Sequence, residues 1–239
     1  MVYGNLHYFP IVLSIWFLIT FITLYIMSVC MKDVEPIFPY ISDTGTFVPE
    51  SCIFGQLLNT GSIIMGIVFY IRYLQVKELH ESLGKTAEVS GKNKACLHMG
   101  WMASFGVSVV GNFQETNLLI VHLIGAVMAF GLGSAYQITM WRVTVLTDPE
   151  SRCLRNFRFV LSMLSTIACI VSFSFAVPAA IQFTGKDLTK WKREDGGYTY
   201  HLLSTSFEWV CATSTMFFIL TFAPDFKKIS LEPPKINLL

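Results

Sequence analysis

The sequence predicts an all-α integral membrane protein: a bundle of six transmembrane helices with a structured first outer loop and both termini in the cytosol. The chain of 239 residues is 53% hydrophobic and 14% charged, with a mean hydropathy of +0.55. Soluble domains carry about 25% charged residues, so this composition indicates a membrane protein. Six apolar stretches approach the roughly 20 residues that a bilayer-spanning helix needs. We expect one domain over 1–239, with helices at about 9–29, 52–71, 95–113, 118–141, 159–183 and 202–223 and a short cytosolic tail at 226–239.

The first two helices are separated by a loop whose composition restricts its conformation. The stretch 9–29 carries no charged residue, and 52–71 follows Pro49 and Glu50, which suit the first turn of a helix. Three prolines and a turn signal at 42–45 indicate an ordered loop. We expect this loop to offer a contact surface made of Tyr40, Ser42, Asp43, Thr44, Gly45 and Glu50.

The third helix has the weakest support of the six. Its apolar stretch is rich in glycine and reaches spanning length only if Asn112 and Phe113 are included. A short connection at about 113–117 makes the third and fourth helices antiparallel neighbours, and their glycines favour close packing. Without the third helix, five spans would put the termini on opposite sides of the membrane.

The distribution of Lys and Arg predicts the orientation. If the chain crosses six times, the side that holds both termini carries 12 of the 17 basic residues and the other side carries five. Basic residues gather in cytosolic loops, so both termini are expected in the cytosol. The first, third and fifth loops then face the lumen or the exterior.

Three arginines recur every three residues ahead of the fifth helix: Arg152, Arg155 and Arg158. On a helix they share roughly one face near the inner leaflet. This spacing suggests contact with anionic lipid headgroups. The alternative is ordinary flanking charge that binds no ligand.

The cysteines and the catalytic motifs are less informative. Cys30 and Cys52 fall at the outer ends of adjacent helices, where they either pair in an oxidising lumen or stay as two buried thiols. The sequence contains no zinc motif, no nucleophile elbow and no phosphate-binding loop. We therefore predict no catalytic residue, no metal site and no cofactor.

Polar side chains from four helices are predicted to gather in the outer half of the bundle: Gln56, Asn59, Asn112, His122 and Glu208. Polar groups are costly within a bilayer, so these side chains should face protein or water. The sequence leaves three interpretations. They form hydrogen bonds between helices, they line a small polar cavity for lipid headgroups or a solute, or they respond to protons through Glu208 and His122.

Several short segments carry a family resemblance. They read PYISDTG at 39–45, PESCIFG at 49–55, VGNFQE at 110–115, YHL at 200–202, EW at 208–209, LTF at 220–222 and DF at 225–226. In this order they resemble the damage-regulated autophagy modulator (DRAM) family and the related transmembrane-150 branch. The resemblance implies six spans, residence in lysosomes or related endomembranes, and promotion of autophagy. It supplies no catalytic residue.

The resulting prediction is a non-enzymatic, multi-pass membrane regulator of autophagy and lysosomal or endomembrane function. It would act through membrane lipids and membrane-protein partners; the net charge of +1 gives no reason to expect nucleic acid. The alternative is a small-solute, lipid or proton-linked transporter or channel that uses the outer polar residues. The expected location is the lysosome or late endosome, with the plasma membrane as the alternative.

Overall fold

The computed structural model describes residues 4–82, 87–148 and 151–232, and these residues are built from helices joined by loops. The elements are α1 (Tyr8–Met31), η1 (Asp43–Gly45), α2 (Glu50–Ser82), α3 (Ala87–Asn112), α4 (Glu115–Ala126), η2 (Val127–Leu132), α5 (Gly133–Thr147), α6 (Arg152–Gln182), α7 (Tyr198–Leu220) and α8 (Ala223–Phe226).

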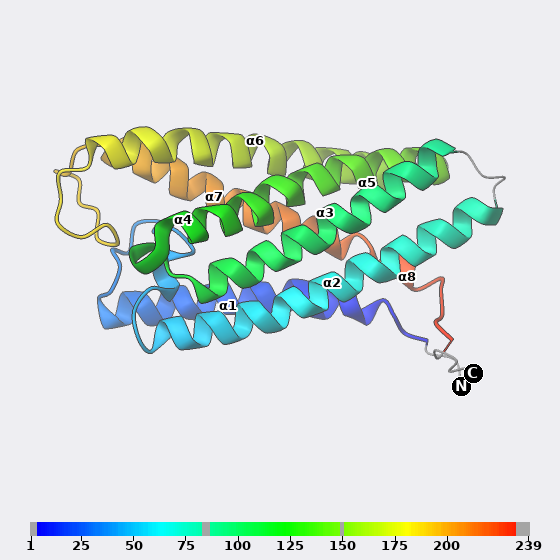
Figure 1. Cartoon of the computed structure of the whole chain (residues 1–239), viewed down its shortest axis with the longest axis horizontal. Coiled ribbons are helices and arrows are strands. Elements are labelled where there is room, and N and C mark those ends of the chain that lie inside the picture. The colour runs from blue at the N-terminus through cyan, green and yellow to red at the C-terminus, as the bar shows by residue number, and fades with distance from the viewer. Residues whose placement is uncertain (1–3, 83–86, 149–150, 233–239) are drawn as a thin grey trace.

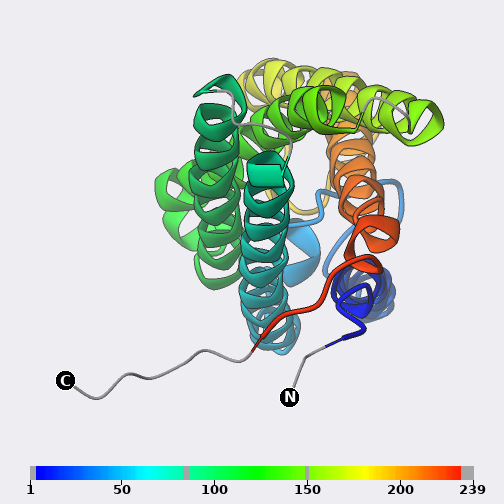
Figure 2. The ribbon, with the colours of Figure 1, turned by 90° about the vertical axis from the view of Figure 1, so that its right-hand side faces the viewer.

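The long helices lie roughly parallel to one axis and form a bundle (Figure 1). Elements α4, η2 and α5 follow one another directly and form one long helix, with a kink at Leu118 near its start and a π-helical segment at its centre. Helix α6 packs along α7 and helix α2 packs along α3. Seen from one end, α2 and α3 lie side by side, and α7 lies between α6 and α1 (Figure 2).

The two ends of the bundle differ, and we name them for what they carry. The loop end holds the connections 32–49 and 183–197. The basic end is where α2 and α5 end and α6 begins, and α8 lies there too (Figure 1).

Five helices are long and apolar enough to cross a membrane: Tyr8–Met31, Glu50–Ser82, Glu115–Thr147, Arg152–Gln182 and Tyr198–Phe226. Helix α3 has 26 residues but is not among them. Its first turns carry Glu88, Lys92 and Lys94, which lower its hydropathy. The all-α membrane fold is therefore confirmed, while the sixth span stays a prediction.

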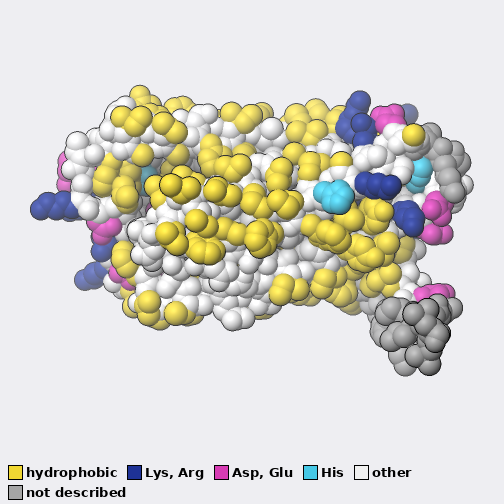
Figure 3. Space-filling model, in the orientation of Figure 1, with side chains coloured by type: hydrophobic (Ala, Val, Ile, Leu, Met, Phe, Trp, Pro, Cys, Tyr) yellow, Lys and Arg dark blue, Asp and Glu magenta, His cyan; other side chains and the backbone are white. Residues whose placement is uncertain are grey.

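Apolar side chains cover the outside of the bundle. Among the most exposed are Ile19, Ile63, Ile120 and Ile181, each more than half exposed and each from a different helix. Hydrophobic atoms run along the length of the molecule, and charged side chains gather toward its two ends (Figure 3). Such a belt is a liability in water, whereas lipid chains would cover it at no cost.

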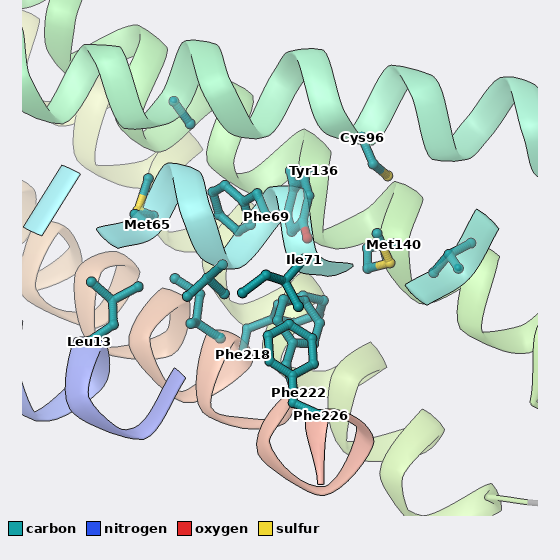
Figure 4. Close-up of a cluster of buried hydrophobic side chains, with 14 of the residues drawn as sticks. Leu13, Met65, Phe69, Ile71, Cys96, Tyr136, Met140, Phe218, Phe222 and Phe226 are labelled. Carbon is teal, nitrogen blue, oxygen red and sulfur yellow. The ribbon is translucent and has the colours of Figure 1, made fainter. Parts of the chain in front are cut away.

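A cluster of aromatic side chains joins three helices inside the bundle, toward the basic end (Figure 4). The rings of Phe69 of α2 and Tyr136 of α5 have centroids 4.2 Å apart. Phe218 and Phe222 meet Tyr136 edge-on, and Phe222 stacks on Phe226 of α8. Edge-on contacts of this kind add to the free energy gained from burial. They hold α2, α5 and the α7–α8 segment together.

Glycines let α3 approach the α4–η2 segment. A Cβ at Gly106 would lie 2.6 Å from the backbone oxygen of Gly125 and from the backbone nitrogen of Ala129. No side chain can fit there without separating the helices, as the small-residue interfaces of membrane proteins require.

We expect Gly106→Ala to lower the melting temperature of the purified protein by several degrees, since overpacking costs about 1–3 kcal/mol. The matched control is Gly91→Ala in the same helix, where an added Cβ meets no atom within 4 Å. The control should raise the melting temperature slightly, because alanine is a better helix former than glycine. Equal losses in the two variants would contradict close packing at Gly106.

Candidate functional site at the loop end

The loop between α1 and α2 folds back into the end of the bundle. The backbone N–H of Tyr40 donates to Oδ2 of Asp43 at 3.0 Å, and the hydroxyl of Thr44 donates to the carbonyl of Ile41 at 2.7 Å. Residues 41–46 are all buried. These short-range hydrogen bonds close the turn signalled by Ser42-Asp43-Thr44-Gly45.

Three side chains of α7 hold the loop in place. Oε2 of Glu208 accepts a hydrogen bond from the backbone N–H of Ile41 at 2.7 Å. The indole N–H of Trp209 donates to the carbonyl of Pro39 at 2.9 Å, and the hydroxyl of Tyr40 donates to Oγ of Ser204 at 2.6 Å. Because Ser204 and Glu208 are four residues apart, they lie on one face of the helix. The loop packs on that face of α7.

Three carboxyl groups converge beneath the loop, from Asp43, Glu115 of α4 and Glu208. The hydroxyl of Ser42 donates to Oε2 of Glu115 at 3.3 Å. Asp43 is 2% exposed, and its Oδ1 has no hydrogen-bond partner among the described residues. Burial, followed by the nearby charges of Glu115 and Glu208, raises the pKa of Asp43 well above its usual range. The Tyr40 N–H opposes this shift.

His201 joins the loop to the second connection, 183–197. Its ring stacks on Trp191, with centroids 4.2 Å apart and an interplanar angle of 6°. Tyr40 meets the same ring edge-on at 5.2 Å. This contact could not be predicted from the sequence, because Trp191 lies in a loop and equally suits an interfacial anchor.

A small cavity of about 90 Å³ lies between the loop and the helices. Most of its wall is apolar, with Phe17, Phe54 and Phe130 among the lining side chains. Glu208 and His122 also line it. A water molecule occupies about 30 Å³ in the liquid, so the cavity has room for about three waters or a short apolar group.

The polar residues predicted to form one cluster are divided between two places, so that prediction is wrong. His122 and Glu208 line the cavity, and Nδ1 of His122 lies 2.7 Å from the carbonyl oxygen of Phe113. Asn59 and Asn112 instead pair with each other across α2 and α3, through amide hydrogen bonds of 3.1 and 2.9 Å on the outer face. Gln56 is exposed and interacts with Thr60 of its own helix.

The residues predicted to form an outer contact surface mostly point inward. Ser42, Asp43, Thr44, Gly45 and Glu50 are buried, and Tyr40 is half-buried. The ring of Phe54 occupies the space where a Gly45 side chain would lie. The exposed apolar residues of the loop are Ile37, Phe38, Phe47 and Val48. These four residues, and not the turn, form the outer surface.

The prediction of one basic face is wrong for Arg158, which is buried inside the bundle while Arg152 is exposed. It is 0% exposed, and its Nη2 donates to Oδ2 of Asp225 at 2.6 Å. Arg152 is exposed and Arg155 is half-buried. Arg72 donates to the same Asp225 oxygen at 2.8 Å. Sequence reasoning missed this pairing because Asp225 lies 67 residues from Arg158.

The structure also shows where the two predicted disulfide cysteines lie and whether possible metal ligands are grouped. Cys30 and Cys52 are free and exposed. Within residues 4–82, 87–148 and 151–232, no three His, Cys, Asp or Glu side chains are grouped as they would be around a metal ion.

Comparisons with known proteins give a consistent assignment. The family model described as the Frag1/DRAM/Sfk1/Cwh43P N-terminal domain matches residues 5–229. DNA damage-regulated autophagy modulator protein 2 of Bos taurus is 36% identical over 235 residues, which cover 95% of this chain and 86% of that protein. DNA damage-regulated autophagy modulator protein 1 of Homo sapiens is 31% identical over 223 residues, covering 93% and 92%. Modulator of macroautophagy TMEM150B of Homo sapiens is 33% identical over 173 residues, covering 70% and 71%. No solved structure matches the chain.

The raised pKa of Asp43 makes loop docking depend on pH. The folded protein holds this proton more tightly than the unfolded chain, so the stabilisation is fully present below the unfolded pKa and is lost as pH rises through the folded pKa. We expect the backbone of 36–47 to exchange hydrogen for deuterium faster, after correction for intrinsic rates, as pH rises from about 5 to 8. The Asp43→Asn variant should lose this dependence, because Glu115 and Glu208 then face a neutral amide. Identical pH profiles in the two proteins would contradict the role of Asp43.

Proposed function

This chain belongs to the Frag1/DRAM/Sfk1/Cwh43P family, and on that premise we propose that it is a multi-pass membrane regulator of autophagy that resides in lysosomes or late endosomes. The observation that carries the proposal is the match to two named autophagy modulators over 95% and 93% of this chain. A third relative, 33% identical, is named a modulator of macroautophagy. The relatives are named as modulators and not as enzymes, which supports a non-enzymatic role.

The proposed topology has six spans with both termini in the cytosol. Helix α3 would then be the third span, since it lies within the bundle between α2 and the α4–η2–α5 helix. Its glycines bring it close to both neighbours, so its low hydropathy is compensated by protein contacts instead of lipid contacts. The basic end would face the cytosol, and the loop end would face the lumen.

The proposed mode of action is binding to membrane lipids or to other membrane proteins. Ile37, Phe38 and Val48 are exposed at the loop end, where lipid headgroups or a partner protein would meet them. The carboxyl groups of the candidate site help to fix the position of these exposed residues, because Glu208 accepts a hydrogen bond from the backbone of Ile41 in the same loop. Binding at the lumenal side would therefore respond to lumenal pH.

Transport through the loop-end cavity is less well supported. The volume of about 90 Å³ is far below the 300–1,000 Å³ typical of ligand pockets. Glu208 is already engaged by the N–H of Ile41, and His122 by the carbonyl of Phe113. These contacts favour the interpretation in which polar side chains join the loop and helices to one another.

The topology is tested by adding glycosylation acceptors, since the sequence contains no Asn-x-Ser/Thr. Asp187→Asn creates Asn-Leu-Thr in the second loop-end connection, and His80→Asn creates Asn-Glu-Ser near the end of α2. When the full chain is expressed in cells, we expect a glycosidase-sensitive mass increase only for Asp187→Asn. Modification of the His80 variant would contradict a cytosolic basic end.

The cellular function is tested by removing the protein and measuring autophagic flux, as turnover of a lipidated autophagosome marker with and without blocked lysosomal degradation. We expect flux to fall and the native chain to restore it. Glu208→Ala should restore less, because removing the acceptor leaves the buried N–H of Ile41 unpaired, which costs about 1–3 kcal/mol and releases the loop. Glu194→Ala, at an exposed position, should restore it fully. Unchanged flux in the absence of the protein would overturn the proposal.

A further inference from the structure

The basic end of the bundle contains a buried positive charge without a matching negative one. Arg72 of α2 and Arg158 of α6 both donate to Oδ2 of Asp225, at 2.8 and 2.6 Å. The three residues are 5%, 0% and 8% exposed. Two guanidinium groups therefore share one carboxylate, and a charge of about +1 is left in a largely desolvated place. Buried charges are stable only when they are paired.

The two arginines differ in how completely they are hydrogen-bonded. Arg158 also donates from Nε to the hydroxyl of Thr221 and from Nη1 to that of Thr144. Arg72 donates from Nη1 to Gln75, but its Nε is buried and has no hydrogen-bond partner among the described residues. Both guanidinium groups lie 5.2 Å from the centroid of the Phe222 ring. The ring attracts the cations but does not neutralise them.

A cavity of about 470 Å³ borders these three side chains. Arg72, Arg158 and Asp225 all line it, and it reaches the surface where the exposed residues Glu78 and Lys228 contribute to its wall. Its volume lies within the 300–1,000 Å³ range of small-molecule pockets. Unlike the loop-end cavity, it is large enough for a small anion and is lined by two guanidinium groups.

We infer that this cavity binds an anion carrying a single phosphate group, with Arg72 as its principal contact. An anion in the cavity would offset the charge that a single carboxylate leaves unpaired on the two guanidinium groups; guanidinium groups suit phosphate oxygens in geometry and charge. Lys228 adds a second cation at the mouth, whereas Glu78 and Asp148 also line the cavity. Those two acids disfavour highly charged anions, which is why one phosphate group fits better than several. The terminal phosphate of phosphatidic acid and free phosphate share this chemistry, whereas the phosphate of phosphatidylserine or phosphatidylcholine is a diester with fewer free oxygens.

The test uses the purified full-length protein. Its melting temperature is measured with added sodium phosphate and with sodium chloride at equal ionic strength. Separately, binding is measured to phosphatidylcholine vesicles containing phosphatidic acid or the same proportion of phosphatidylserine. We expect phosphate to raise the melting temperature more than chloride, or phosphatidic acid to bind better than phosphatidylserine. The first result would identify the ligand as free phosphate, and the second would identify it as a lipid headgroup.

The key variant is Arg72→Gln, which leaves Arg158 and Asp225 as a one-to-one ion pair and should therefore fold. Its apparent affinity for the preferred anion should fall at least about tenfold, as expected when a charge-assisted hydrogen bond is lost. Lys227→Gln removes the same charge from an exposed residue that does not line the cavity, and should bind as the native protein does.

Two results would overturn the inference: no preference for phosphate over chloride together with none for phosphatidic acid, or equal losses in the Arg72 and Lys227 variants. If Arg72→Gln does not fold, the inference is tested by the two measurements on the native protein: the melting temperature in phosphate and in chloride, and the binding to vesicles with phosphatidic acid or phosphatidylserine. These results are independent of autophagic flux, so failure here and failure of the proposed function are distinguishable.

Discussion

A lipid bilayer supplies no water to a buried donor or acceptor, so the polar side chains inside this bundle are stabilised by partners within the protein. At the loop end, Glu208 accepts from the backbone of Ile41. At the centre, Gln137 of α5 donates to Ser165 of α6 and Thr215 of α7. At the basic end, Asp225 accepts from two arginines. Each contact joins segments distant in sequence. Polar pairing, as well as apolar burial, therefore determines which helices are neighbours.

The two ends of the bundle carry opposite surpluses of charge. At the loop end, Asp43 lies buried beside Glu115 and Glu208, and its raised pKa shows that the folded state favours the protonated carboxyl. A proton is enough to relieve that surplus. A guanidinium group holds its proton throughout the physiological pH range, so the surplus at the basic end is relieved only by an anion. One end is therefore sensitive to pH, and the other to anionic ligands.

The sequence predicts the helices better than it predicts the site. Six apolar stretches locate the helices, although α2 continues to Ser82 because polar residues can extend a helix beyond the bilayer. Hydropathy gives the depth of a polar residue but not the direction it faces. Asn59 and Glu208 are at similar predicted depths, yet one pairs with Asn112 on the outer face and the other points inward. Arg158 looked like a flanking charge because its partner Asp225 belongs to a different helix.

Helix α7 connects the two charged ends. It carries Glu208 near the loop and leads directly into α8, which holds Asp225. The two residues are separated by about 25 Å at 1.5 Å per residue of helix. The contacts of Glu208 at the loop end and of Asp225 at the basic end both stabilise the position of the same segment, α7 and α8. If an anion at α8 changes how strongly the loop docks, linkage requires that a proton at Asp43 changes the anion affinity by the same factor. In this bundle, α7 is the physical link through which protonation at the loop end and an anionic ligand at the basic end would act on each other.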